Sequence, residues 1–390
     1  MDTIRNFDVN MPTRIVFGAG RISEIGTISL DYGKRALLVT YKDIRGLEQT
    51  IEKVEDQLVK DGLSVTKYSE VVPDPPTEVI NQGAEIVKKE GIDVLIGIGG
   101  GSAIDAAKAI GVVAVNGGDA YDYMACNPNS KKVTVSMPVI AVPTTSGTGS
   151  ETTAVAVLTK LDLKTKGSIV STAVFAKVAI VDPELSATMP PSLTASTGID
   201  AFGHAMEAFI SKKATPYVER LAPYAVKLIW ENLPIAYKDG NNMLARANMA
   251  WGSTLAGMML AQSGVIGVHA VSQALGAHLH VPHGLGVAIA TPIFLEFNRA
   301  DAVDRYVKLA EELGIGEGMK NKDDIADEFI KQVKAFLGKF NIPADLKDRV
   351  NEINRAELIE NAMTNAPLSI GNNPRHLDKA EMEKIIAEII

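Results

Sequence analysis

The first half of the chain alternates short apolar runs rich in β-branched residues with amphipathic stretches at helical spacing. The apolar runs predict buried strands at 35–41, 63–68, 93–98, 139–142 and 178–181. The amphipathic stretches predict helices at 49–61 and 77–90. Strand–helix alternation of this kind is typical of a parallel sheet covered by helices on both faces.

Beyond residue 185 the strand-like runs nearly vanish and helical periodicity dominates. Helices are predicted at 191–212, 216–231, 243–261, 265–279, 301–313, 323–340 and 379–390, with a solvated turn at 238–242. A Met189-Pro190-Pro191 step marks a stop between the two patterns. We therefore predict an α/β domain at 1–187, followed by an all-helical domain at 188–390.

Composition narrows the range of partners and compartments. A formal net charge of −8 argues against a nucleic-acid partner. The single cysteine, Cys126, excludes an intramolecular disulfide and suits a reducing cytoplasm. The N-terminus shows no apolar core of signal-peptide length, and the apolar stretch 251–277 is broken by glycines and His269. We interpret that stretch as a buried helix pair rather than a membrane span, and expect a cytoplasmic protein with no membrane partner.

Histidine is scarce but concentrated. Four of the six histidines lie within fifteen residues: His269, His278, His280 and His283. Upstream, Asp200 and His204 are spaced i, i+4, which places both on one face of a helix. A carboxylate with imidazoles is a ligand set for a divalent transition metal such as zinc or ferrous iron. The residues therefore indicate metal-assisted chemistry.

Two unusual loops follow predicted strands. The segment Gly99-Gly100-Gly101-Ser102 joins a strand to a helix, where free N–H groups at the helix start can bind a phosphate. It is not the dinucleotide fingerprint G-x-G-x-x-G, and alone it could be a plain turn. The second loop, 143–151, is rich in hydroxyls and glycines, and alone could be a simple Ser/Thr-rich turn. Both loops leave the carboxyl ends of strands, where open α/β sheets bind ligands.

The motifs occur in a fixed order along the chain. They are Gly99-Gly100-Gly101-Ser102-x-x-Asp105-x-x-Lys108, the 143–151 loop, Asp182-Pro183-Glu184-Leu185, Gly198-x-Asp200-x-x-x-His204, His269 through His283-Gly284, and Asn373-Pro374-Arg375. In this order they resemble an iron-containing (group III) alcohol dehydrogenase over essentially the whole chain. The resemblance implies a dinucleotide-binding domain, a helical domain, an active site in the cleft between them, and a homodimer or larger even homo-oligomer.

The resemblance also implies one ferrous ion, with zinc possible, held by one aspartate and three histidines. Asp200, His204, His269 and His283 fill those positions here. Any one of these histidines could be a helix-packing residue, but the set is complete. His278 and His280 are interpreted as cleft or surface residues rather than ligands.

For the nucleotide, the resemblance carries over a set of residues along the first domain. Gly100, Gly101 and Ser102 fall on the pyrophosphate site, Lys166 near a ribose and Asp74 near the adenosine half. The remaining positions are Asp105, at the start of the helix beneath the nicotinamide side, and Thr144, Thr145, Thr148 and Val157, which line the nucleotide.

Two departures from the family pattern concern specificity. Where NAD-preferring members place an acid that repels a 2′-phosphate, this chain has Tyr41, with Lys42 and Arg45 nearby and Asp43 displaced. We therefore favour NADP(H) over NAD(H), unless Asp43 turns inward.

The second departure lies four residues after His269, where many members have another histidine and this chain has Gln273. A glutamine can orient a substrate but cannot shuttle a proton. We place Gln273 on the substrate side and predict that His278, His280 or water serves the proton.

Together these features predict an NAD(P)-linked dehydrogenase acting on small primary alcohols, diols or aldehydes, with the metal polarising the substrate oxygen. A hydroxyacid or other polar substrate is an alternative. A phosphate-using relative of the fold is disfavoured because 253–282 contains no Lys or Arg. A non-catalytic nucleotide-binding or assembly module is disfavoured by the complete ligand set.

Overall fold

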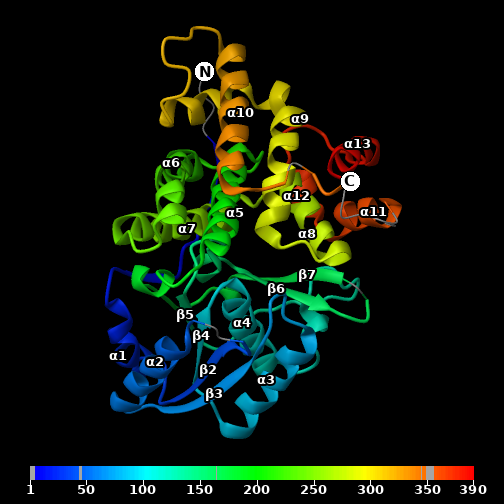
Figure 1. Ribbon diagram of the computed structural model, residues 1–390. Helices are drawn as coiled ribbons and strands as arrows, with labels where there is room; N and C mark the ends of the chain where they lie inside the picture. Colours follow the sequence, from blue (N-terminus) through cyan, green and yellow to red (C-terminus); the bar gives the residue numbers. More distant parts are fainter. Residues whose placement is uncertain (1–4, 44–45, 164, 344, 348–354) are drawn as a thin grey trace.

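A computed structural model describes residues 5–43, 46–163, 165–343, 345–347 and 355–390, and divides them into a sheet-containing half and a helical half (Figure 1). The strands are β1 Arg14–Phe17, β2 Arg35–Tyr41, β3 Ser64–Val71, β4 Val94–Gly99, β5 Val139–Pro143, β6 Val155–Lys160, β7 Thr165–Val170 and β8 Val178–Val181. The helices are α1 Ile25–Leu30, α2 Glu48–Lys60, α3 Thr77–Glu90, α4 Gly101–Asn116, α5 Pro191–Ile210, α6 Pro216–Lys238, α7 Met243–Ser263, α8 Gly267–Leu279, α9 His283–Glu312, α10 Lys322–Leu337, α11 Arg355–Asn365, α12 Pro367–Asn372 and α13 Lys379–Ile389.

Six of these strands form one parallel sheet in the order β1-β8-β5-β4-β2-β3. Alternate side chains of a strand face opposite sides, so β2 sends Leu37 and Val39 into one core and Ala36 and Leu38 into another. Helices α3 and α4 cover the first side, and α1 and α2 cover the second (Figure 1). The predicted parallel sheet with helices on both faces is confirmed.

The described residues after β8 form helices and no strand. Helix α5 is central, since it packs against α6, α7 and α9, and its Phe202 and Phe209 are fully buried in the helical core. The predicted fold class, an α/β N-terminal region followed by an all-helical region, is therefore confirmed.

Two helices extend well beyond their predicted ends, by more than two residues. Helix α9 begins at His283 rather than residue 301, and α6 runs through Pro234 to Lys238 rather than ending at 231. The first turns of α9 are buried on almost every side and carry Pro292, so they lack the polar face that marks a helix in a sequence. The 238–242 turn follows as predicted, between α6 and α7.

The hairpin of β6 and β7 was not predicted. Its strands pair antiparallel from Val155–Val170 to Lys160–Thr165, and β7 reaches the helical half by contacting α8 and α11. In Figure 1 the hairpin lies directly beneath α8, so it borders the space between the two halves.

The two halves also meet where the loop after β5 touches α7. A Cβ on Gly149 would lie 2.5 Å from the Cα of Gly257, so the two backbones touch with no side chain between them. Beside this contact Thr254 Oγ1 donates to the buried carboxylate of Glu151 at 2.8 Å. This junction brings the polar loop against the helical half.

Helices α7 and α8 meet at a bend of 104° around 264–266. Among the described residues no single helix is long and apolar enough to cross a membrane; only this bent pair, taken together, reaches the length and composition required.

Candidate metal centre and nucleotide-binding surface

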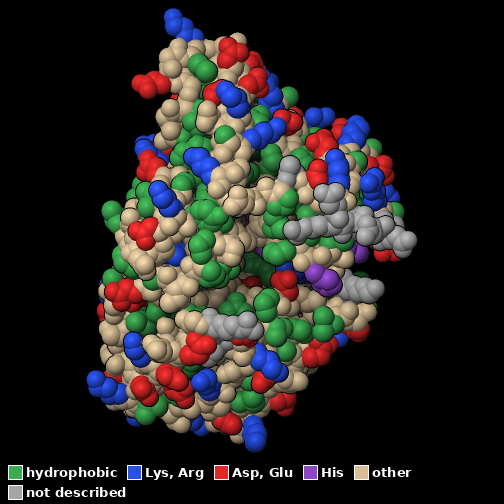
Figure 2. Space-filling view, viewed as in Figure 1, with side chains coloured by type: hydrophobic (Ala, Val, Ile, Leu, Met, Phe, Trp, Pro, Cys, Tyr) green, Lys and Arg blue, Asp and Glu red, His purple; other side chains and the backbone are tan. Residues whose placement is uncertain are grey.

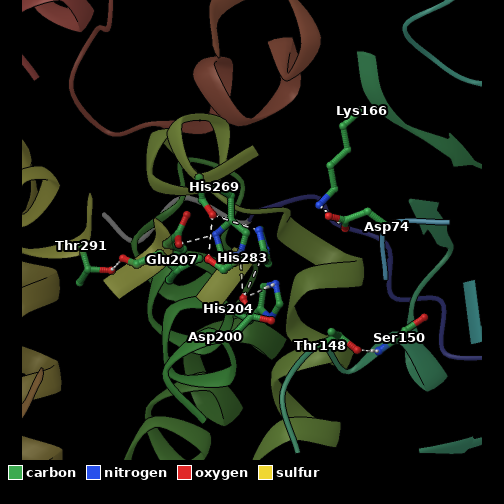
Figure 3. A network of polar contacts seen from close by, with 12 residues as sticks. Asp74, Thr148, Ser150, Lys166, Asp200, His204, Glu207, His269, His283 and Thr291 are labelled. Atoms are coloured by element: carbon green, nitrogen blue, oxygen red, sulfur yellow. Dashed lines mark hydrogen bonds and ion pairs between the residues drawn. The ribbon is translucent and has the colours of Figure 1, made fainter. Parts of the chain in front are cut away.

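Four side chains from three helices converge on one point (Figure 3). Asp200 and His204 lie one turn apart on α5, His269 lies on α8, and His283 is the first residue of α9. The Nε2 atoms of His269 and His283 are each 3.4 Å from Asp200 Oδ1, and that of His204 is 3.8 Å away. One atom from each residue lies within 4.8 Å of the others. The structure therefore brings together all four predicted ligands.

Local sequence explains how α8 and α9 present their histidines to each other. Helix α8 ends at His280, whose left-handed backbone (φ +53°) reverses the chain, and α9 starts after Pro282. The rings of His269 and His283 consequently meet at a centroid distance of 5.2 Å. Gly284 allows the start of α9 to approach α5, because a Cβ there would collide with the backbone carbonyl of Ser196.

The ring nitrogens that face away from the centre have different partners. His269 Nδ1 lies 2.6 Å from the Oε1 atom of Glu207, a fully buried residue of α5. His283 Nδ1 lies 3.0 Å from the hydroxyl of Ser272 on α8. His204 Nδ1 is buried and has no hydrogen-bond partner within the described part of the chain.

Burial and charge set the protonation of the cluster. Burial lowers the pKa of His204 to about 4, and it also lowers the pKa of His283, with Asp200 only partly opposing it. Burial alone would raise the pKa of Asp200, but the three histidines lower it well below its usual range. Burial would lower the pKa of His269 too, but Glu207 and Asp200 outweigh it and raise that pKa to about 10. Without another cation, the excess negative charge is balanced by a proton on His269.

The donor set fits a divalent metal. Asp200 Oδ1 and His269 Nε2 are buried and, among the described residues, form no hydrogen bond. When His269 is neutral and protonated at Nδ1, its Nε2 lone pair faces the Asp200 oxygen 3.4 Å away, an arrangement that is unfavourable unless a cation lies between them. One carboxylate oxygen and three imidazoles suit iron or zinc better than magnesium or calcium, which prefer oxygen ligands. The side chain of His283 is 28% exposed, whereas those of the other three are at most 7% exposed, so access is from the His283 side.

The predicted phosphate loop lies at the carboxyl end of β4, at the start of α4. A Cβ on Gly101 would lie 2.6 Å from Cγ2 of Thr148, and one on Gly100 would lie 3.0 Å from the Tyr41 hydroxyl and 3.3 Å from Thr145 Oγ1. The glycine loop, the 143–151 loop and the end of β2 thus form one surface, as the sequence predicted. Thr144 is buried at the base of this surface, at the end of β5.

Two buried charges brace that surface from below. Asp105 is enclosed, and its two carboxylate oxygens accept hydrogen bonds from Ser150 Oγ and from the Val157 N–H. Lys108, also fully buried, donates to the carbonyl oxygens of Ser150, Thr153 and Val155. The structure thus places Asp105 as a support for the loop and for β6.

Lys166 projects from β7 and forms an ion pair with Asp74, with Nζ 2.6 Å from Oδ1 (Figure 3). Lys166 is buried, whereas the Asp74 side chain is 55% exposed. The backbone N–H of Asp74 donates to Ser102 Oγ at 3.3 Å. The pair therefore joins the hairpin to the glycine loop. Figure 2 shows a hollow between the two halves, with histidine side chains along one side.

The residues predicted on the substrate side occupy different faces of α8. Gln273 is half-buried and follows His269 by one turn, so both lie on one face. His278 follows His269 by two and a half turns and lies on the opposite face, while His280 is exposed at the helix end. Helical geometry thus favours Gln273 over His278 beside the metal centre. Asp43 is exposed beyond β2, and Arg45 lies outside the described residues.

Two residues of the centre escaped the sequence analysis. Glu207 and Ser272 contact the outer nitrogens of His269 and His283. A signal for Glu207 was present, because it lies three residues after His204 as the one acidic residue in an otherwise apolar half of α5. Ser272 carried no such signal.

Comparison with known proteins identifies the class of protein that this fold and site define. Residues 12–183 match the family model "Iron-containing alcohol dehydrogenase", and residues 194–390 match that of the family's C-terminal domain. The chain belongs to the iron-containing alcohol dehydrogenase family and is an oxidoreductase.

Individual relatives span almost the whole chain. It is 35% identical to the NAD-dependent methanol dehydrogenase of Bacillus methanolicus, covering 96% of this chain and 98% of that protein. It is 34% identical to the NADPH-dependent butanol dehydrogenase of Clostridium saccharobutylicum, covering 96% of each. An archaeal halo-thermophilic Red Sea brine pool alcohol dehydrogenase, solved bound to NZQ, superposes with a TM-score of 0.94 at 31% identity, covering 100% of both chains.

Proposed function

We propose that this protein is a ferrous-dependent alcohol dehydrogenase and aldehyde reductase that uses NADP(H) in preference to NAD(H) and acts on small primary alcohols, diols or aldehydes. The observation that carries the proposal is the convergence of three imidazole Nε2 atoms within 3.4 to 3.8 Å of one buried carboxylate oxygen. This centre lies beside a glycine loop at the carboxyl ends of parallel strands, where α/β sheets bind nucleotides.

Asp200, His204, His269 and His283 would hold the metal. When bound, the ion supplies Lewis acidity at the substrate oxygen, and the nicotinamide exchanges a hydride with the substrate carbon. Zinc fits the same donors, so iron is favoured here by membership of the family rather than by the ligand set.

The chain's own residues position the reactants. The glycine loop and the N-terminal turn of α4 offer backbone N–H groups to the pyrophosphate. Lys166 would donate to a ribose hydroxyl, after sharing or releasing Asp74. Gln273, on the face of His269, would orient a substrate oxygen through its amide but cannot accept a proton. The loop at Gly149 and the β6–β7 hairpin border the space and would limit water around the reacting atoms.

The nucleotide preference depends on the end of β2. Tyr41 lies against the glycine loop, and its neutral hydroxyl would not repel a 2′-phosphate as a carboxylate would. Burial raises the pKa of Tyr41, which keeps the phenol neutral at physiological pH. Lys42, however, already forms an ion pair with Glu70 on β3 at 3.1 Å. It could attract a 2′-phosphate only by leaving Glu70. The preference for NADP(H) is therefore expected to be modest.

The test is anaerobic turnover by protein reconstituted with ferrous ion or zinc. NADPH and NADH oxidation would be followed side by side with a panel of short aldehydes, before and after a chelator is added. We expect chelator-sensitive turnover, higher with iron, and a larger kcat/KM for NADPH. Absence of turnover despite bound iron would contradict the simple-aldehyde assignment, and a polar-substrate panel would then test whether Gln273 selects a different class.

A further inference from the structure

The three imidazoles of the metal centre differ in what holds their outer nitrogens. His283 contacts a hydroxyl, and His204 Nδ1 forms no hydrogen bond among the described residues, although the nearby backbone of Gly147 partly opposes the burial that lowers the pKa of His204. His269 alone contacts a carboxylate, the fully buried Oε1 of Glu207, at 2.6 Å (Figure 3). This asymmetry distinguishes His269 from the other ligands.

Glu207 uses both of its oxygens. While Oε1 faces His269 Nδ1, Oε2 accepts the backbone N–H of Ile266 at 2.8 Å. Ile266 immediately precedes α8, and its own carbonyl accepts the N–H of His269 at 3.2 Å. One carboxylate on α5 thus holds both the first turn of α8 and the imidazole that this turn carries.

The bend before α8 does not depend on Glu207 alone. Ser211 Oγ donates to the Ser263 carbonyl at 2.9 Å, and Ser263 Oγ donates to the Ala208 carbonyl at 3.0 Å. Asn372 adds bonds from its Nδ2 to the carbonyls of Ser263 and Val265. The backbone should therefore keep its course when Glu207 is replaced by an isosteric residue.

The position of the Glu207 carboxylate decides which nitrogen of His269 carries the proton, because Oε2 accepts the Ile266 N–H and Oε1 faces Nδ1. Because Glu207 Oε1 acts as a hydrogen-bond acceptor here, a neutral His269 carries its proton on Nδ1. The lone pair of Nε2 then faces Asp200. Ser272 constrains His283 less, because its hydroxyl, which donates to the His283 carbonyl at 2.9 Å, is neutral and can exchange its donor and acceptor roles. A carboxylate behind an imidazole also makes the ring a stronger donor to a metal.

We propose that Glu207 is a positioning residue that makes His269 the anchoring ligand of the metal centre. It fixes the tautomer and orientation of the ring and places a buried carboxylate oxygen directly behind it. The inference rests on the proposed metal centre. Loss of such an outer partner is expected to weaken metal binding about 10- to 100-fold.

Glu207→Gln is the decisive variant. A glutamine offers one acceptor and one donor. It therefore either loses one of the two bonds or donates to His269 Nδ1, which moves the ring proton to Nε2 and removes the lone pair that would bind the metal. Affinity for Co²⁺ and Zn²⁺ would be measured by chelator competition, and the visible absorption of bound Co²⁺ would report ligand geometry. We expect about 10- to 100-fold weaker binding and an altered Co²⁺ spectrum.

Ser263→Ala is the matched control. It removes a buried hydrogen bond from the same bend without touching His269, so stability should fall while Co²⁺ affinity and spectrum stay unchanged. Equal affinity and identical spectra for wild type and Glu207→Gln would overturn the inference and leave the metal centre standing. Failure of the wild type to bind either ion would instead refute the centre itself.

A measurement on the wild type guards against a variant that does not fold. In zinc-loaded protein with ¹⁵N-labelled histidine, NMR should show a ring metal-bound through Nε2 with a protonated, strongly hydrogen-bonded Nδ1. Assignment of that ring to His269 would support the inference. A zinc-bound His269 with an unprotonated Nδ1 would exclude it.

Discussion

The metal centre and the nucleotide-facing surface lie side by side but are built in different ways. The centre consists of side chains on three helices, and its ligand identities cannot be exchanged for others of similar size. The nucleotide surface consists mainly of backbone, glycines and hydroxyls on loops that follow β2, β4 and β5, with Asp105 and Lys108 supporting it from below.

This difference predicts that the two sites tolerate substitution to different degrees. The metal centre needs all four ligand side chains, so a substitution at any of them should abolish the reaction rather than alter it. A loop surface would recognise the pyrophosphate through its backbone, so single side chains such as Tyr41 could change without loss of the proposed site. Cofactor choice should therefore change more readily than the reaction.

The largest effect on turnover is expected from removing one ligand of the metal centre. Asp200→Ala should lose bound metal and reduce turnover about 1000-fold or more, because charge on the substrate oxygen is then no longer stabilised by several kcal/mol. Metal content by mass spectrometry and aldehyde-dependent NADPH oxidation would test this. Asp74→Ala, which removes a carboxylate from the nucleotide side, should retain its metal; a full metal content in Asp200→Ala would contradict the assignment.

A substitution in the glycine loop should weaken nucleotide binding and leave metal binding unchanged. In Gly101→Ala the new methyl group would lie 2.6 Å from Thr148 Cγ2, and relieving this overlap should weaken nucleotide binding about tenfold or more. Fluorescence titration with NADPH would give the Kd. Gly371→Ala, where a Cβ meets open space, is the control. Equal affinities for all three proteins would show that the loop does not contact the cofactor.

The coenzyme ratio should shift when an acid is restored at the end of β2. Tyr41→Asp should favour NADH over NADPH by roughly tenfold or more relative to the wild type, through repulsion of the 2′-phosphate. The ratio of kcat/KM values measures this directly. Tyr41→Phe removes only the hydroxyl and should leave the ratio within a few-fold. An unchanged ratio in Tyr41→Asp would place the adenosine ribose elsewhere.

The smallest effect concerns proton transfer. Gln273→His adds a group that titrates near neutral pH on the face of His269, so the pH profile of kcat/KM should gain an ionisation there while the rate changes by less than about tenfold. His278→Gln, on the opposite face of α8, should leave the profile unaltered. A changed profile in His278→Gln would restore His278 as the proton-transferring residue.

Prediction from sequence succeeded where residue type and spacing carried the signal. Asp200 and His204 could be recognised by their helical spacing. The glycines of the phosphate loop could be recognised by their position after a strand. The first half of α9 was missed because burial on all sides erases amphipathic periodicity. The β6–β7 hairpin was missed because no Asn-Gly or Asp-Gly turn marks it.

Within the candidate site, too, contacts that depend on tertiary packing could not be predicted from the sequence. The ligands could be predicted, whereas the contact of Ser272 with His283 depends on how α8 and α9 meet, which no local pattern encodes. Whether Asp105 would line the surface or support it likewise depended on tertiary burial.

The contact between Gly149 and Gly257 has a consequence for laboratory evolution. Since two bare backbones meet there, a library that randomises either position should yield almost exclusively inactive clones, whatever substrate is used for selection. Met258, next to Gly257 on the same helix, is partly buried and packs against the helical core, so it should accept mainly other apolar side chains. Between this contact and the bend, Met259 and Ser263 are buried as well, so randomising those positions should lower stability.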